Sequence, residues 1–123
     1  MFNSKKIGVV IPCLNEESLI TETLNAVPKF VDIIYVINDG STDNTAGVVG
    51  NYIKKDKRVI LLNNKVNMGN GYSAVRGLKQ GINEGMDVMC IVAGDNQCRQ
   101  EYLELMVYEV ITNNIDYAKA SRF

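Results

Sequence analysis

The stretch Ile33-Ile34-Tyr35-Val36-Ile37-Asn38-Asp39-Gly40-Ser41-Thr42-Asp43 decides the fold, because an apolar run ends directly in acids, a glycine and hydroxyls. Residues 33–37 are rich in β-branched side chains, which is typical of a parallel strand that is buried on both faces. Open α/β sheets bind their ligands just beyond the carboxyl ends of such strands. Residues 38–43 are therefore candidates for a binding site, although a turn followed by a helix cap explains the same residue types.

Strands alternate with helices along the rest of the chain. Apolar runs predict further strands over 6–12, 59–62, 88–92 and 117–121. Apolar residues at helical spacing predict helices from the N-cap Asn15 to Pro28, over 45–55, from the turn at 67–71 to Gly85, and over 101–113. Such helices join strands by right-handed crossovers, which gives a mostly parallel sheet. The predicted fold class is α/β, a doubly wound, Rossmann-like sheet with helices on both faces.

The composition is typical of one domain. The chain has 123 residues, of which 46% are hydrophobic and 22% charged, and its net charge of -1 comes without a basic block. This balance argues against a nucleic-acid partner. No run approaches the roughly 20 apolar residues of a membrane span, and the three cysteines lack C-x-x-C spacing, which fits a reducing cytoplasm. The chain has no histidine, so catalysis falls to carboxylates, lysines, tyrosines, backbone groups or a metal.

Four polar loops follow predicted strands, at 12–16, 38–43, 67–71 and 94–97. Because the carboxyl ends of parallel strands meet at one edge, we expect these loops to form one pocket. The first and third predicted helices begin at this edge, and we expect their free N–H groups to attract a phosphate. The predicted ligand is therefore anionic and carries phosphate. Gly69 and Gly71 fit such a loop, and turn geometry alone explains them equally.

Two carboxylates at strand ends are the candidates for specific recognition. Asp39 is expected to accept a hydrogen bond from the N–H edge of uracil or guanine, or else to form an Asx-turn beside Gly40. Asp95 has no basic neighbour before Arg99 and suits Mg²⁺ or Mn²⁺, which commonly use one or two carboxylates together with phosphate and water. Gln97 is expected to hold a metal-bound water or a sugar hydroxyl. A capping role for Asp95 and a solvated Gln97 remain open alternatives.

These loops, with the strands before them, resemble the inverting family-2 glycosyltransferases of the GT-A fold, and within that family the dolichyl- and polyprenyl-phosphate sugar synthases. The matching segments are 9–16, 37–43, 67–71 and 94–97. The resemblance implies a nucleotide-sugar site made of Pro12, Leu14, Glu16, Asp39, Asn67, Gly69, Gly71, Asp95 and Gln97, with Asp95 as the metal ligand. It also implies Mg²⁺ or Mn²⁺ as the cofactor. The implied reaction transfers a sugar with inversion from a UDP- or GDP-linked donor to a polyprenyl or dolichyl phosphate, or to a glycan.

Three residues depart from the pattern of that family. Asn38 stands at the first acid of Asp-Asp-Gly-Ser, Ala93 at the first acid of Asp-x-Asp, and Leu14 where many members of this branch have a tyrosine. Asp39 is then the only charge left at its motif, and Asp95 alone would hold the metal. The catalytic base is unassigned, and an acceptor phosphate that is already anionic needs little deprotonation.

The resemblance also implies that an acceptor half follows residue 123. We therefore expect residues 1–123 to be a single GT-A nucleotide-sugar-binding domain within a longer chain that works in the cytoplasm, or at the cytoplasmic face of the membrane, on the cell envelope. An open apolar edge would favour a homo-oligomer. A dinucleotide-dependent oxidoreductase is disfavoured, because no Gly-x-Gly-x-x-Gly follows the first strand. A non-catalytic nucleotide-binding or assembly module remains an alternative.

Overall fold

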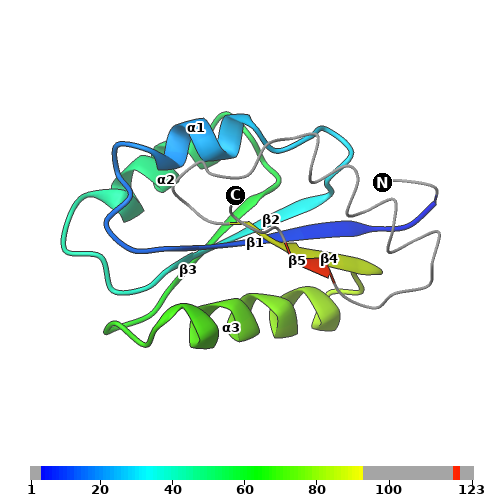
Figure 1. Ribbon diagram of the computed structural model, residues 1–123. Helices are drawn as coiled ribbons and strands as arrows, with labels where there is room; N and C mark the ends of the chain where they lie inside the picture. Colours follow the sequence, from blue (N-terminus) through cyan, green and yellow to red (C-terminus); the bar gives the residue numbers. More distant parts are fainter. Residues whose placement is uncertain (1–3, 93–117, 120–123) are drawn as a thin grey trace.

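A parallel β-sheet forms the centre of the computed structural model, which describes residues 4–92 and 118–119 (Figure 1). Within these residues the sheet has five strands in the order β3-β2-β1-β4-β5, and every neighbouring pair is parallel. The strands are β1 (Ile7–Cys13), β2 (Ile33–Asn38), β3 (Val59–Asn63), β4 (Val88–Ile91) and β5 (Ala118–Lys119). The predicted parallel sheet is therefore confirmed, with small shifts at the strand ends.

Helices lie on both faces of this sheet. The described helices are α1 (Ile20–Asn25), α2 (Thr45–Ile53) and α3 (Asn70–Asn83). α1 and α2 cover one face, and α3 covers the other (Figure 1). None of these helices is long and apolar enough to span a membrane. The doubly wound arrangement is confirmed, while the helix predicted over 101–113 lies outside the described residues.

The order of the strands reverses beside β1. From β1 the chain moves outward through β2 to β3, and then returns to place β4 on the other side of β1. Because crossovers of this type are right-handed, the reversal sends α3 to the face opposite α1 and α2. Folds of this class bind their ligands at the carboxyl edge beside such a reversal. The ends of β1 and its neighbours are thus the first place to look for a site.

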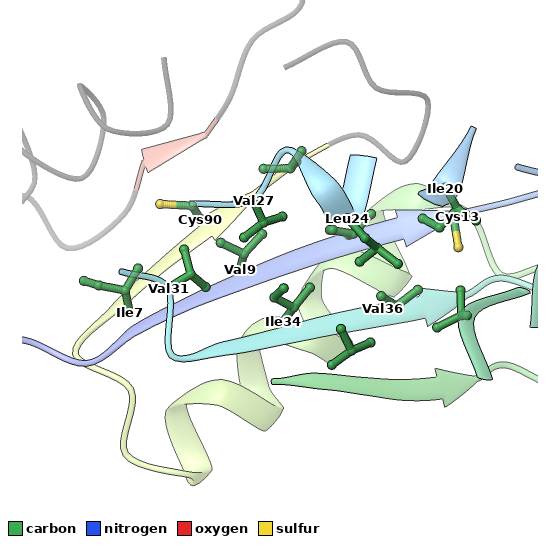
Figure 2. Close-up of a cluster of buried hydrophobic side chains, with 14 of the residues drawn as sticks. Ile7, Val9, Cys13, Ile20, Leu24, Val27, Val31, Ile34, Val36 and Cys90 are labelled. Carbon is green, nitrogen blue, oxygen red and sulfur yellow. The ribbon is translucent and has the colours of Figure 1, made fainter. Parts of the chain in front are cut away.

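Alternate residues of the strands fill two separate buried clusters. Val9 and Val36 belong to the larger cluster, which receives Leu24 from α1 (Figure 2). Val10 and Tyr35 belong to the second cluster, which packs against α3. Successive residues of a strand point to opposite faces. A sheet that is covered on both sides therefore needs the continuous apolar runs that the sequence shows.

Tyr35 brings a polar group into the cluster beneath α3. Its hydroxyl donates a hydrogen bond to Glu84 Oε1 at 2.6 Å, just beyond the last residue of α3. Burial, together with the hydrogen bond and charge of Glu84, raises the pKa of the Tyr35 phenol. The phenol stays protonated at neutral pH and ties the C-terminal end of α3 to β2.

Candidate functional site

Three loops start side by side at the carboxyl edge of the sheet. They are the β1 loop (residues 14–17), the β2 loop (residues 39–45) and the β3 loop (residues 64–69). The N–H of Asp39 donates to the carbonyl of Cys13 at 2.9 Å, and the N–H of Asn64 donates to the carbonyl of Asn38 at 2.9 Å. These bonds continue the strand pairing into the loops. The predicted meeting of the first three polar segments is confirmed.

Side chains that bind backbone groups hold the β1 loop to the β2 loop. The N–H of Asn15 donates to Ser41 Oγ at 3.0 Å, and the N–H of Glu16 donates to Thr45 Oγ1 at 3.0 Å. In the other direction, Asn15 Oδ1 accepts from the N–H of Thr42 at 2.8 Å. Asn15 has a φ of 55°, a left-handed conformation that asparagine tolerates better than most residues. The two loops thus interlock.

This interlocking overturns the predicted start of the first helix. The prediction that Asn15 caps a helix beginning at residue 16 is wrong, because α1 begins at Ile20 and ends at Asn25. The N–H groups of residues 15–17 each donate to a side chain of the β2 loop. They neither enter a helix nor remain free. The N–H groups that we expected to be free for a phosphate just past Pro12 are therefore bonded to the β2 loop, and phosphate binding at this edge stays a prediction.

Asp39 lies between the β2 loop and the β3 loop and is only 1% exposed. Its Oδ1 accepts from the N–H of Met68 at 2.7 Å and from Asn64 Nδ2 at 2.9 Å. Its Oδ2 accepts from the N–H of Gly69 at 3.0 Å. All three donors belong to the β3 loop, 25 to 30 residues further along the chain. The carboxylate joins two loops and does not form the local Asx-turn that the sequence left open.

The hydrogen bonds to Asp39 decide its ionisation. Burial acts to raise the pKa of Asp39, but hydrogen bonds from the N–H of Met68, the amide of Asn64, the N–H of Gly69 and the hydroxyl of Ser73 together outweigh it and hold that pKa below its usual range. The group is therefore a carboxylate at neutral pH, with hydrogen bonds to both of its oxygens. Direct acceptance from a nucleotide base stays a prediction, in which the base would compete with the donors of the β3 loop.

Asn64 extends this contact into α3. Its Nδ2 also donates to Ser73 Oγ at 2.9 Å, and its Oδ1 accepts from Arg76 Nη1 at 2.7 Å. Asn64 and Ser73 are both buried. Asn64, Ser73 and Arg76 are not among the residues that the sequence predicted for the site. The signal available for Asn64 is its position, as a polar residue directly after a strand. The chain of contacts from Asp39 through Asn64 reaches the N-terminal half of α3.

Gly40 allows the β3 loop to come close. Its φ is 73°, and a Cβ at this position would lie 2.6 Å from the backbone nitrogen of Asn67 and 2.8 Å from the carbonyl carbon of Val66. Both the backbone conformation and the short approach require a residue without a side chain. Asp39 and Gly40 together form the surface on which the β3 loop lies.

The predicted residues of segment 67–71 lie where the β3 loop meets α3. Asn67 is exposed, and its Oδ1 accepts from the N–H of Gly69 at 3.1 Å. Gly69 is the N-cap of α3, with a φ of 94° and no side-chain cap from the described residues. Gly71 is in the first turn, where a Cβ would meet nothing within 4 Å. Turn geometry therefore explains Gly69 and not Gly71.

Negative charge gathers at the carboxyl end of β1. Burial raises the pKa of the Cys13 thiol to about 12, and the charges of Glu16, Asp43 and Asp39 add to this shift. Cys13 therefore stays a protonated thiol at neutral pH and is not a nucleophile. A diphosphate bound at this edge would meet the same negative charge, so a cation would favour its binding.

The remaining predicted residues divide between exposed positions and undescribed ones. Pro12 and Glu16 are partly exposed, and Leu14 is 37% exposed. Asp95 and Gln97 lie outside the described residues. Across residues 4–92 and 118–119, no group of three or more cysteine, aspartate or glutamate side chains is placed to hold a metal ion. The structure thus brings together the residues of three predicted loops, and the fourth loop stays a prediction.

The strand order and the polar carboxyl edge define a doubly wound α/β domain of the kind that binds its ligand beside β1. Residues 8–123 match the family described as Glycosyl transferase family 2, and the chain belongs to this family. The resemblance drawn from the four polar segments is therefore confirmed.

Solved structures share this fold. S. aureus TarS (residues 1–349) in complex with UDP aligns over 89% of this chain and 33% of its own, with a TM-score of 0.71 and 27% identity. The mannosyltransferase PcManGT from Pyrobaculum calidifontis, in complex with GDP-Man and Mn²⁺, aligns over 89% of this chain and 33% of its own, with a TM-score of 0.76 and 18% identity. At 18% identity the second match shows the fold alone. The chain has the GT-A fold.

Curated relatives are longer than this chain. A dolichyl-phosphate beta-glucosyltransferase of Trichomonas vaginalis is 39% identical over 79 residues, which cover 55% of this chain and 23% of the relative. An uncharacterized protein of Methanocaldococcus jannaschii is 30% identical over 122 residues, which cover 98% of this chain and 48% of the relative. The chain thus spans between about a quarter and a half of the length of these relatives.

Proposed function

We propose that this chain binds the nucleotide-sugar donor of an inverting glycosyltransferase. The observation that carries the proposal is the meeting of the β1, β2 and β3 loops at the edge beside the strand-order reversal, in a chain of glycosyl transferase family 2. TarS was solved with UDP and PcManGT with GDP-Man, which supports a UDP- or GDP-linked sugar as the donor. Residues 1–123 would then form one nucleotide-sugar-binding domain of a longer enzyme.

The proposed donor site joins the predicted residues of all four loops. In this proposal the β1 loop and segment 67–71 flank the nucleotide, and the loop after β4 holds the diphosphate. The full set is Pro12, Leu14, Glu16, Asp39, Asn67, Gly69, Gly71, Asp95 and Gln97.

A divalent cation, Mg²⁺ or Mn²⁺, is proposed to bind at Asp95. Mn²⁺ in the PcManGT complex supports a cation in this fold. The negative charges of Glu16 and Asp43 near the end of β1 would also attract a cation to this edge. When bound, such an ion stabilises the charge that develops on the departing diphosphate. Since the described residues do not themselves form a metal site, the proposal rests on the position of Asp95 in the sequence after β4.

The proposed reaction is a single displacement at the anomeric carbon of the donor sugar. An acceptor oxygen forms the new bond to that carbon as the bond to the diphosphate oxygen breaks, and the nucleoside diphosphate leaves with the electron pair. A polyprenyl or dolichyl phosphate is the proposed acceptor, supported by the relative of Trichomonas vaginalis. Its phosphate oxygen is already anionic and needs no strong base. The whole enzyme would act at the cytoplasmic face of the membrane that holds the lipid.

Calorimetric titration of the chain with UDP and with GDP, each with and without Mn²⁺, tests this function. We expect one nucleotide to bind more tightly than the other, and Mn²⁺ to strengthen that binding. Asp95→Asn should remove the effect of Mn²⁺ while the metal-free affinity stays the same. If the folded chain binds neither nucleotide, the donor-site proposal fails and a non-catalytic assembly module becomes the better explanation.

A further inference from the structure

We propose that the outward side of α3 binds the surface of an anionic lipid bilayer. This side carries Tyr72, Val75, Lys79 and Ile82, which we call the α3 surface, and all four side chains are exposed. The role rests on the proposed function, because a lipid acceptor would require the enzyme to work at a membrane.

α3 packs against the sheet through its opposite side. Gly77 and Gly81 are buried, and a Cβ on them would overlap the side chains of Val10 and Met89. The helix therefore lies close against β1 and β4. The residues of the α3 surface follow one another at intervals of three, four and three along the chain, which places them on one side of a helix. That side is turned away from the sheet.

Exposed apolar side chains gather in the β3 loop and α3. This part of the chain holds five of the seven large hydrophobic side chains that are exposed in the described residues. The five, each between 48% and 65% exposed, are Val66, Met68, Tyr72, Val75 and Ile82. Single exposed apolar side chains are ordinary, but a group of them on one side of a helix indicates an interaction surface.

The charge of the same segment is positive. Residues 57–83 contain five basic residues and no acidic residue, although the whole chain has a net charge of -1. Lys65 and Lys79 are exposed, and Arg76 donates to a neutral amide oxygen that leaves its charge in place. The next acid, Glu84, lies beyond the last residue of α3. Cations beside exposed apolar side chains complement an anionic bilayer.

The same charge disfavours a second copy of this chain as the partner. Two α3 surfaces packed together would bring lysines of like charge against each other. On a bilayer, Lys79 can keep its ammonium among the headgroup phosphates while its methylene groups follow the apolar boundary. Tyr72 suits that boundary too, because its ring is apolar and its hydroxyl is polar.

This contact would bring the proposed donor site to the membrane. α3 follows the β3 loop at the carboxyl edge of the sheet, and the α3 surface extends about 15 Å along the helix from there. With α3 on the bilayer, this edge would lie beside the headgroups, where a polyprenyl or dolichyl phosphate presents its phosphate. α1 and α2 cover the other face of the sheet (Figure 1) and would point away from the membrane.

Flotation of the chain with lipid vesicles, in the absence of nucleotide, tests the α3 surface. We expect binding to vesicles of equal parts phosphatidylcholine and phosphatidylglycerol, and much weaker binding to phosphatidylcholine alone. Val75→Gln combined with Ile82→Gln should weaken binding to the mixed vesicles by about ten-fold or more, and Lys79→Gln by about five-fold. No binding by the folded parent chain, or binding that these variants leave unchanged, overturns the proposal.

Leu19→Gln and Lys55→Gln are the matched controls. Both side chains are exposed, and they lie next to α1 and α2, on the other face of the sheet. Their binding to the mixed vesicles should equal that of the parent chain. Controls that weaken binding as much as the α3 variants would show that α3 is not the contact.

A single tryptophan locates the contact in a second way. The chain has no tryptophan, so Tyr72→Trp and Leu19→Trp each report on one position. When mixed vesicles are added, we expect the emission of Tyr72→Trp to shift to shorter wavelength, because indole enters the apolar boundary. The emission of Leu19→Trp should stay unchanged. The reverse pattern would place the membrane on the other face and overturn the proposal.

Nucleotide titration and ultracentrifugation separate this proposal from its alternatives. The Val75→Gln and Ile82→Gln double variant should keep the parent's affinity for UDP and GDP, since neither residue belongs to the proposed donor site. If the parent chain binds neither nucleotide, the proposed function fails, and vesicle binding still decides the role of α3. A dimer that the double variant dissociates, without vesicle binding, would make the α3 surface an interface between copies and overturn the proposal.

Discussion

The β2 loop makes two contacts of opposite character. Toward the β1 loop it uses Ser41 Oγ and the N–H of Thr42, which both bond to the exposed Asn15, and the partly exposed carboxylate of Asp43. Toward the β3 loop it uses the buried carboxylate of Asp39. Water can replace a lost partner at the exposed contact but not at the buried one. The comparison teaches that the β3 loop depends on one side chain, whereas the β1 loop is held by several replaceable ones.

Removing the buried carboxylate should give the largest effect. Asp39→Ala removes the buried acceptor that three donors of the β3 loop share and leaves the N–H of Met68 without its bond, and we expect the free energy of unfolding to fall by about 3 kcal/mol. Urea denaturation followed by circular dichroism measures this loss. Asp43→Ala, the control at the partly exposed contact with the β1 loop, should lose clearly less. Equal losses in the two variants would mean that burial does not separate the two contacts.

Acid should weaken the same buried contact. The pKa of Asp39 is lower in the folded chain than its usual value, which is about 3.9 in an unfolded peptide. Its contribution to stability is therefore complete above that value and is lost as the pH falls through the lower folded pKa. The stability difference between the parent chain and Asp39→Asn should shrink below about pH 4. A difference that stays constant down to pH 2.5 would contradict the charged contact.

Filling the space at Gly40 tests how closely the β3 loop must approach the β2 loop. Gly40→Ala meets a φ of 73° and the backbone of Asn67, and we expect it to cost about 2 kcal/mol of unfolding free energy. Gly71→Ala is its matched control, because a Cβ there meets nothing within 4 Å in the first turn of α3. Helix propensity should make that control neutral or up to about 1 kcal/mol more stable. A tolerated alanine at Gly40 would show that the β3 loop can move away freely.

The exposed contact should give the smallest effect. Asn15→Gly keeps the left-handed backbone at a φ of 55° and removes the Oδ1 acceptor, so we expect a loss of about 0.5 to 1 kcal/mol. Asn15→Ala should lose about 1 kcal/mol more, because alanine tolerates this φ poorly. Thermal or urea unfolding resolves both values. A loss in Asn15→Gly as large as that of Asp39→Ala would erase the contrast between the two contacts.

The sheet was predictable from the sequence because its strands are buried on both faces. Their apolar runs, such as 33–37, predict strands even when the neighbouring strands in the sheet are unknown. The start of α1 was not predictable from the sequence. Residues 15–17 look helical, but their N–H groups donate to side chains of the β2 loop. The hydrogen-bond partners of Asp39 were also not predictable from the sequence. Its donors lie 25 to 30 residues away, and contacts of side chains with a distant backbone leave no periodic pattern.

The backbone bonds that continue past the ends of β1, β2 and β3 have a consequence for the evolution of this edge. The paths of the β2 loop and the β3 loop begin with main-chain bonds, between Asp39 and Cys13 and between Asn64 and Asn38, and such bonds do not depend on which side chains stand nearby. The exposed Leu14 and Asn67 can therefore be exchanged while the frame around them persists. A library randomised at these two positions would explore new ligand preferences on an unchanged scaffold.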